Sequence, residues 1–110
     1  EMRGDWRAAI AAYERERELS PTDATIPAQI GRVHRRLGEL ERAEELLLET
    51  LKVVPSHGRS HYELALVYQE MGRRDDAVAR LERALETWAP ADEDFRWARL
   101  AREKLAELRG

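Results

Sequence analysis

The chain has 110 residues, of which 43% are hydrophobic and 37% charged, with no cysteine and a formal net charge of −3. This composition is too apolar for a disordered chain and too charged for a membrane span, and it excludes disulfides. The negative balance argues against general attraction to nucleic acid, so we expect neither nucleic acid nor a membrane as partner. The start, EMRGDWR, lacks the apolar core of a signal peptide, which leaves the compartment open and favours the cytoplasm.

A first helix is predicted within residues 5–20. Asp5 is the expected N-cap, and the Ser-Pro pair at 20–21 ends the helix. The apolar face consists of five residues at helical spacing, Trp6, Ala9, Ile10, Tyr13 and Arg17. We expect this segment to be the second helix of a pair whose first helix is missing.

A complete helix pair is predicted over residues 24–57. Pro27 suits the first turn of its first helix, and Gly38 is expected to take the left-handed turn that closes it. Gly31 has no side chain and should allow the second helix to cross closely. The second helix runs from about residue 40 to 53 and should bury Leu40, Ala43, Leu46, Leu47, Thr50, Leu51 and Val54.

The same pattern returns over residues 58–91. Ser56 or Ser60 is the expected cap of the first helix, and Gly72 is the expected turn. The second helix should bury Ala77, Val78, Leu81, Ala84, Leu85 and Trp88 before Pro90 breaks the chain. A last helix over residues 92–109, opened by three acidic residues, has no partner after it and is expected to cap the open end of the array.

The helix pairs repeat with a period of 34 residues. The residues in phase are Gly4, Gly38 and Gly72; Ala9, Ala43 and Ala77; Tyr13, Leu47 and Leu81; and Pro21 and Pro55. With Ile30-Gly31, His34, Leu64-Ala65, Tyr68, Ala84 and Leu85, these positions resemble the tetratricopeptide repeat, a helix–turn–helix unit. The resemblance implies one all-α domain, a right-handed α-solenoid of antiparallel helix pairs with about six helices.

The sequence departs from the family pattern at a few positions. Pro27 and His61 replace an aromatic residue near the start of the first helix, and Pro90 is displaced. Thr50 and Glu16 replace a small residue late in the second helix.

No catalytic or metal-binding constellation emerges from the residue pattern. His57 and His61 stand four residues apart, a spacing that places two imidazoles on one helical face, but no further ligand completes a site. We therefore expect solvated imidazoles there and a packing role for His34. No nucleophile motif or phosphate-binding loop is present, so the sequence predicts no enzyme, no cofactor and no metal.

The outward stripe of the first helices is the candidate binding surface. The resemblance implies that these helices line a concave groove for extended peptides or partner helices, and the stripe holds Arg32, Arg35, Arg36, Arg59, Tyr62, Leu66 and Gln69. Arginines beside a tyrosine and a leucine would suit an acidic, partly apolar segment, although solvated arginines are an equal alternative. The lysine–asparagine clamp by which some relatives hold chaperone C-termini is disfavoured, because the chain has no asparagine.

Acidic residues on the second helices are interpreted as a solvated convex face with pairs such as Asp76 and Arg80.

The predicted function of the chain is a protein-interaction module. One alternative is self-association into a homodimer through Trp6, Ile10 and Tyr13, which we expect to be exposed without their partner helix. Another alternative is a regulatory appendage of a larger enzyme.

Overall fold

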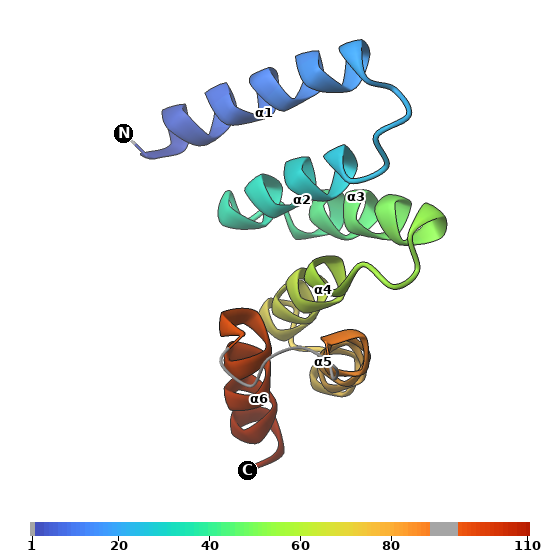
Figure 1. Ribbon diagram of the computed structural model, residues 1–110. Coiled ribbons are helices and arrows are strands. Elements are labelled where there is room, and N and C mark those ends of the chain that lie inside the picture. The colour runs from blue at the N-terminus through green and yellow to red at the C-terminus, as the bar shows by residue number, and fades with distance from the viewer. Residues whose placement is uncertain (1, 89–94) are drawn as a thin grey trace. The chain divides into compact units, whose positions relative to one another are not determined.

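The computed structural model describes residues 2–88 and 95–110, which form six α-helices and no strand. The helices are α1 (Met2–Leu19), α2 (Ile26–Arg36), α3 (Leu40–Val53), α4 (Gly58–Glu70), α5 (Arg74–Trp88) and α6 (Arg96–Arg109) (Figure 1). They belong to two compact units, with α1–α3 in unit 1 (Glu1–Pro55) and α4–α6 in unit 2 (Ser56–Gly110). Within the described ranges, no helix combines the length and apolar character that crossing a membrane requires.

Both helix pairs close with the predicted left-handed glycine. Gly38 has a φ of 80° and Gly72 a φ of 81°. The two turns also share their hydrogen bonds: the residue after each glycine donates its N–H to the carbonyl five residues back, at 2.9 Å for Glu39 to His34 and 2.7 Å for Arg73 to Tyr68. This six-to-one bond satisfies carbonyls that the helix end leaves without a partner. The sequence prediction for both turns is therefore confirmed.

The core of unit 1 forms where α2 crosses α3. Ile26, Ile30 and Leu46 are almost fully buried and pack together. Gly31 makes the close approach possible, because a Cβ atom added there would lie 3.1 Å from the carbonyl oxygen of Ala43. The predicted role of Gly31 is confirmed.

Thr50 shows why a hydroxyl replaces a small residue in this pair. It is fully buried, and its Oγ1 accepts a hydrogen bond from the N–H of Ala28 at 2.9 Å while donating one to the carbonyl of Ala24 at 2.8 Å. Ala28 lies in the first turn of α2, where backbone N–H groups have no partner within the helix. Thr50 therefore ties the start of α2 to α3.

Three predicted helix starts need correction. Helix α1 begins at Met2, so Asp5 lies inside its first turn and is not the N-cap. The N-cap of α4 is His57, whose side chain accepts a hydrogen bond from the N–H of Ser60, in place of Ser56 or Ser60. Helix α6 begins at Arg96 after an extended Phe95. The acidic residues at 92–94 and the predicted break at Pro90 lie outside the described residues.

In unit 2, α4 and α5 form the second pair, and α6 packs against α5 as a capping helix is expected to do (Figure 1). Its inward face carries Ala98, Ala101 and Leu105, all buried. The pair itself buries Leu64, Ala65, Val67, Ala77, Leu81 and Ala84. Val78, Leu85 and Trp88 are only partly buried, as are Leu40 and Val54 in unit 1.

Candidate functional site

The candidate residues of unit 1 lie on the second half of α2. Arg32 and Arg35 are half-buried, whereas Arg36 is exposed in the last turn. The guanidinium carbon of Arg36 lies 5.7 Å from the ring centroid of Trp6 on α1. Cations in the last turn of a helix also interact favourably with its macrodipole. The exposed positive charge of this stripe thus lies near the C-terminal end of α2.

In unit 2, the candidate residue Arg59 is held on two sides. Its guanidinium carbon lies 3.7 Å from the ring centroid of Trp97 on α6, a distance at which a cation–π attraction is strong. Its Nε donates a hydrogen bond to Glu63 at 2.9 Å, one turn along α4. The Glu63 side chain is 4% exposed, so this ion pair is shielded from solvent. Arg59 is therefore fixed in position rather than freely solvated.

The candidate Tyr62 is buried, in contrast to its predicted exposure in a groove. It keeps only 7% of its surface exposed, because its ring packs against Trp97 at a centroid distance of 5.9 Å and against Trp88 at 6.4 Å. Phe95 meets Trp88 edge-to-face at 5.3 Å. We call these four rings, Tyr62, Trp88, Phe95 and Trp97, the aromatic cluster. Leu66 and Gln69, farther along α4, are partly exposed.

Gly58 provides the space for this cluster. A Cβ atom added to it would lie 2.5 Å from Nε1 of Trp88, closer than real Cβ contacts come. A side chain at this position would have to push the Trp88 ring away from the start of α4. The absence of a side chain at Gly58 is therefore part of the site's construction.

The residues predicted for self-association are partly covered inside unit 1. Ile10 and Tyr13 pack against the core of Ile26, Ile30 and Leu46, and Trp6 lies beneath Arg36. The prediction that they are exposed without a partner helix is wrong, because α2 covers them. Their role in self-association stays a prediction.

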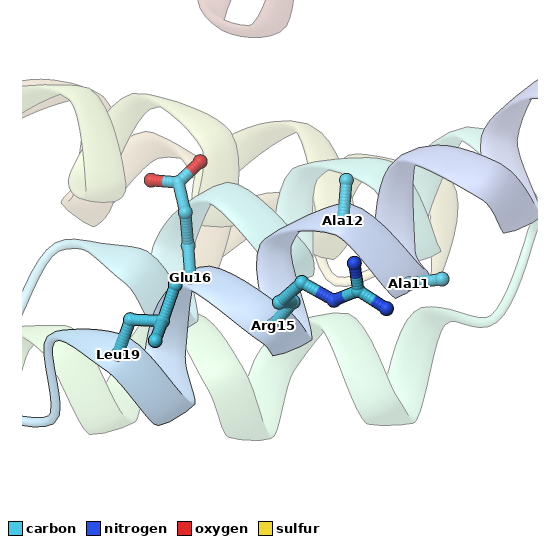
Figure 2. Close-up of a pocket in the computed structure, with 5 residues that line it drawn as sticks. All are labelled: Ala11, Ala12, Arg15, Glu16 and Leu19. Atoms are coloured by element: carbon cyan, nitrogen blue, oxygen red, sulfur yellow. The ribbon is translucent and has the colours of Figure 1, made fainter.

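The exposed side of α1 is not the side that packs against α2. Figure 2 shows the hollow there, lined by Ala11, Ala12, Arg15, Glu16 and Leu19. Leu19 is 78% exposed, which is unusual for a large apolar side chain.

Comparison with known proteins decides the family. The model of the tetratricopeptide repeat matches residues 22–89, which include both complete helix pairs. The chain belongs to the tetratricopeptide repeat (TPR) family. Among curated TPR relatives, the TPR repeat-containing thioredoxin TTL4 of Arabidopsis thaliana is 31% identical over 79 residues. That alignment covers 72% of this chain but only 12% of the plant protein, so the chain spans about an eighth of that relative's length.

Solved TPR structures share the fold at low identity. The type III secretion chaperone SycD of Yersinia enterocolitica, in complex with a peptide of the translocator YopD, matches with a TM-score of 0.86 and 16% identity over 96% of this chain and 81% of SycD. The first TPR of Spaghetti (RPAP3), bound to the HSP90 peptide SRMEEVD, matches with a TM-score of 0.79 and 18% identity over 96% of this chain and 78% of that chain. These likenesses establish an all-α, TPR-like solenoid fold.

The histidines of the TPR pairs are structural. His34 Nδ1 lies 2.7 Å from Glu39 Oε1, and this hydrogen bond, followed by that from Arg7, lowers the pKa of Glu39. His61 is 3% exposed, with its Nδ1 3.2 Å from Arg80. Burial lowers the pKa of His57, and the charge of Arg59 lowers it further. The predicted solvation of His57 and His61 is wrong, and within the described residues no three potential ligands gather into a metal site.

The acidic side of the second TPR helices carries local ion pairs. Asp76 pairs with Arg73 at 2.8 Å, not with Arg80 as predicted, because Arg80 turns to His61. Arg42 and Glu45 form a similar exposed pair on α3 at 3.1 Å. Exposed pairs of this kind stabilise a helix only slightly.

Sequence reasoning missed Glu63, Trp88 and Trp97 as site residues. The spacing of Arg59 and Glu63, one helical turn apart, was an available signal for an ion pair. No such signal existed for Trp97, because α6 lies outside the repeats and the 34-residue period does not relate its residues to those of α4.

Proposed function

We propose that this TPR domain is a non-catalytic protein-interaction module that binds a peptide or partner helix with the outward stripes of α2 and α4. One observation carries the proposal: arginine side chains lie on the first helix of each pair, at positions that the turns and the pair core do not use. Two structures of the same fold hold peptides, SycD that of a translocator and Spaghetti that of HSP90. Both support a peptide or protein as the ligand class.

The chemistry of the stripes favours an acidic, partly apolar segment. Guanidinium groups bind carboxylates through two parallel hydrogen bonds, and Arg32, Arg35 and Arg36 concentrate three of them within two turns of α2. Leu66 adds partly exposed apolar surface on α4. Each helix is proposed to contribute contacts of its own.

The test compares binding of matched peptides by anisotropy. An acidic peptide with aromatic residues should bind the wild-type domain, while versions with the acidic residues made basic should not. The Arg32→Ala/Arg36→Ala variant should weaken binding at least tenfold, equivalent to about 1.4 kcal/mol. Arg83→Ala is the matched control, because Arg83 is an exposed arginine on a second helix.

Equal affinity of the wild type and Arg32→Ala/Arg36→Ala for the acidic peptide would remove the α2 stripe from the proposal. Adding Tyr62→Ala to this variant should reduce the peptide affinity further. Because Tyr62 is buried, circular dichroism would be used to establish that the triple variant is still folded. The peptide SRMEEVD serves as a specificity control. It should bind no more tightly than its scrambled version, because the chain has no asparagine for the clamp.

A second candidate function is self-association, which the exposed Leu19 beside the α1 hollow favours. Sedimentation equilibrium that gives a monomer at high protein concentration would remove it for this chain. If the domain is instead an appendage of a larger enzyme, as its small share of the plant thioredoxin's length allows, the same stripes would bind a segment of that enzyme.

A further inference from the structure

Part of the proposed partner surface is already occupied by the chain itself. The side chain of Trp97, in the first turn of α6, lies against both candidate residues of the first turns of α4, Arg59 and Tyr62. The Trp97 ring centroid lies 3.7 Å from the guanidinium carbon of Arg59, whose Nε donates a hydrogen bond to Glu63. The Trp97 ring therefore contacts both the arginine and the tyrosine.

This contact is not part of the repeat skeleton. Thirty-four residues before Arg59, Tyr62 and Glu63 stand Thr25, Ala28 and Gln29, which have neither aromatic ring nor charge. The α2–α3 pair nevertheless has the same glycine turn and the same fully buried alanine and leucine positions. The fold of a pair consequently does not require the arginine, tyrosine and tryptophan arrangement.

Helix α6 does not depend on Trp97 for its main packing. Its buried residues are Ala98, Ala101 and Leu105, whereas Trp97 is only half-buried. The exposed Arg96 also contacts the ring, with its guanidinium carbon 5.3 Å from the centroid. The tryptophan ring can therefore leave Arg59 and Tyr62 without exposing the inward face of α6.

We propose that Trp97 is an internal occupant of the α4 surface, and that a partner binds there by placing an aromatic side chain of its own between Arg59 and Tyr62. This inference rests on the proposed function and names the partner more narrowly, as an acidic segment with an aromatic residue. Arg59 stays paired with Glu63 throughout, so the guanidinium face is presented in the same orientation to either ring. The apparent affinity for the partner equals the intrinsic affinity multiplied by the fraction of molecules in which Trp97 has left the surface.

The experiment measures anisotropy with two acidic peptides that differ only in a central tryptophan or leucine. Trp97→Ala should bind the tryptophan peptide about tenfold more tightly than the wild type, as expected if the surface is free in a tenth of wild-type molecules. Trp97→Phe should restore weak binding, because phenylalanine refills the space. Arg99→Ala is the matched control, because Arg99 is an exposed residue of the same helix and lies outside the aromatic cluster. It should leave the affinity unchanged.

A second readout follows Trp97 directly. The chain has three tryptophans, so a fluorotryptophan-labelled sample should give three fluorine resonances. The resonance that disappears in Trp97→Phe is that of Trp97. Saturation with the peptide should move the Trp97 resonance toward the position of an exposed ring.

The outcomes separate the two proposals. If the peptide binds the wild type but Trp97→Ala gains nothing and the Trp97 resonance stays in place, the internal-occupant inference is wrong and the proposed function stands. If neither wild type nor Trp97→Ala binds any acidic peptide, the proposed function fails and the inference fails with it. Binding by Trp97→Ala alone supports both.

Discussion

The two helix pairs of this chain share a skeleton but differ in what lies on their first helices. The turns are nearly superimposable in φ, 80° at Gly38 and 81° at Gly72, and the in-phase residues Ala43, Ala77, Leu47 and Leu81 are all fully buried. On α2, the corresponding surface bears arginines near the helix end. On α4, it bears an arginine and a tyrosine that an aromatic ring of α6 covers.

The pairs also anchor the start of the first helix differently. In unit 1, the anchor comes from the neighbouring helix, because Thr50 on α3 accepts the N–H of Ala28. In unit 2, Ala84 takes the place of Thr50 and has no hydroxyl, and His57 caps α4 locally. The two pairs thus share the skeleton, while residues between its fixed positions determine how the start of each first helix is held.

The largest expected effect comes from the shared skeleton. Leu47→Ala and Leu81→Ala should each lower the free energy of unfolding by about 2–5 kcal/mol, because each removes a fully buried side chain and leaves a cavity. Urea denaturation followed by circular dichroism would measure both. The comparison predicts similar losses, and a negligible loss at either position would break the equivalence of the two pairs.

The next effect should come from Thr50, whose two hydrogen bonds to the backbone hold the start of α2 in unit 1. Thr50→Val keeps the shape of the side chain but leaves the N–H of Ala28 and the carbonyl of Ala24 without their hydrogen bonds. We expect a loss of about 1–3 kcal/mol in unfolding free energy. At the matching position of unit 2, Ala84→Thr should also destabilise, because it inserts a hydroxyl and a methyl group at a fully buried position. A stabilising Ala84→Thr would contradict this view of the difference.

The turn glycines should give a smaller loss. Gly38→Ala and Gly72→Ala each place a side chain at a φ near 80°, where an L-residue costs about 1–2 kcal/mol, although neither Cβ would meet another atom within 4 Å. Thermal melting of the two variants would measure the cost. Unequal decreases in melting temperature would contradict the equivalence of the two turns.

The smallest effect should be a pH dependence in unit 2. Burial lowers the pKa of His57 in the folded state, and its neutral side chain accepts the N–H of Ser60. A His whose folded pKa is depressed contributes stability that is complete above its unfolded pKa, about 6.5, and that is lost as the pH falls through the folded value. His57→Asn, with a cap that does not titrate, should lose less stability between pH 7 and pH 5 than the wild type. Parallel pH curves for the two proteins would rule out this role for His57.

Much of the fold could be predicted from the sequence because its determinants are local. A glycine that ends an apolar periodicity, as at Gly38 and Gly72, needs only its own φ to turn the chain, and the 34-residue period relates one pair to the next. Thr50 was recognised as a departure, but its two backbone bonds depend on α2 and could not be predicted from α3 alone.

The candidate site was predicted only in part. The stripe residues of α2 and α4 follow from helical periodicity, yet the covering of Tyr62 depends on Trp97, 35 residues away and outside the repeat period. The role of His57 was missed because histidine is a rare choice for an N-cap compared with Ser, Thr, Asp or Asn.

We propose that the partner binds the first helices and does not contact the second helices. Amide chemical-shift mapping with the acidic tryptophan peptide would test it most directly. We expect chemical-shift changes along the outward residues of α2 and α4, and none at the exposed glutamates of α3 and α5. Shifts concentrated on α3 and α5, or on α1 around Leu19, would contradict it.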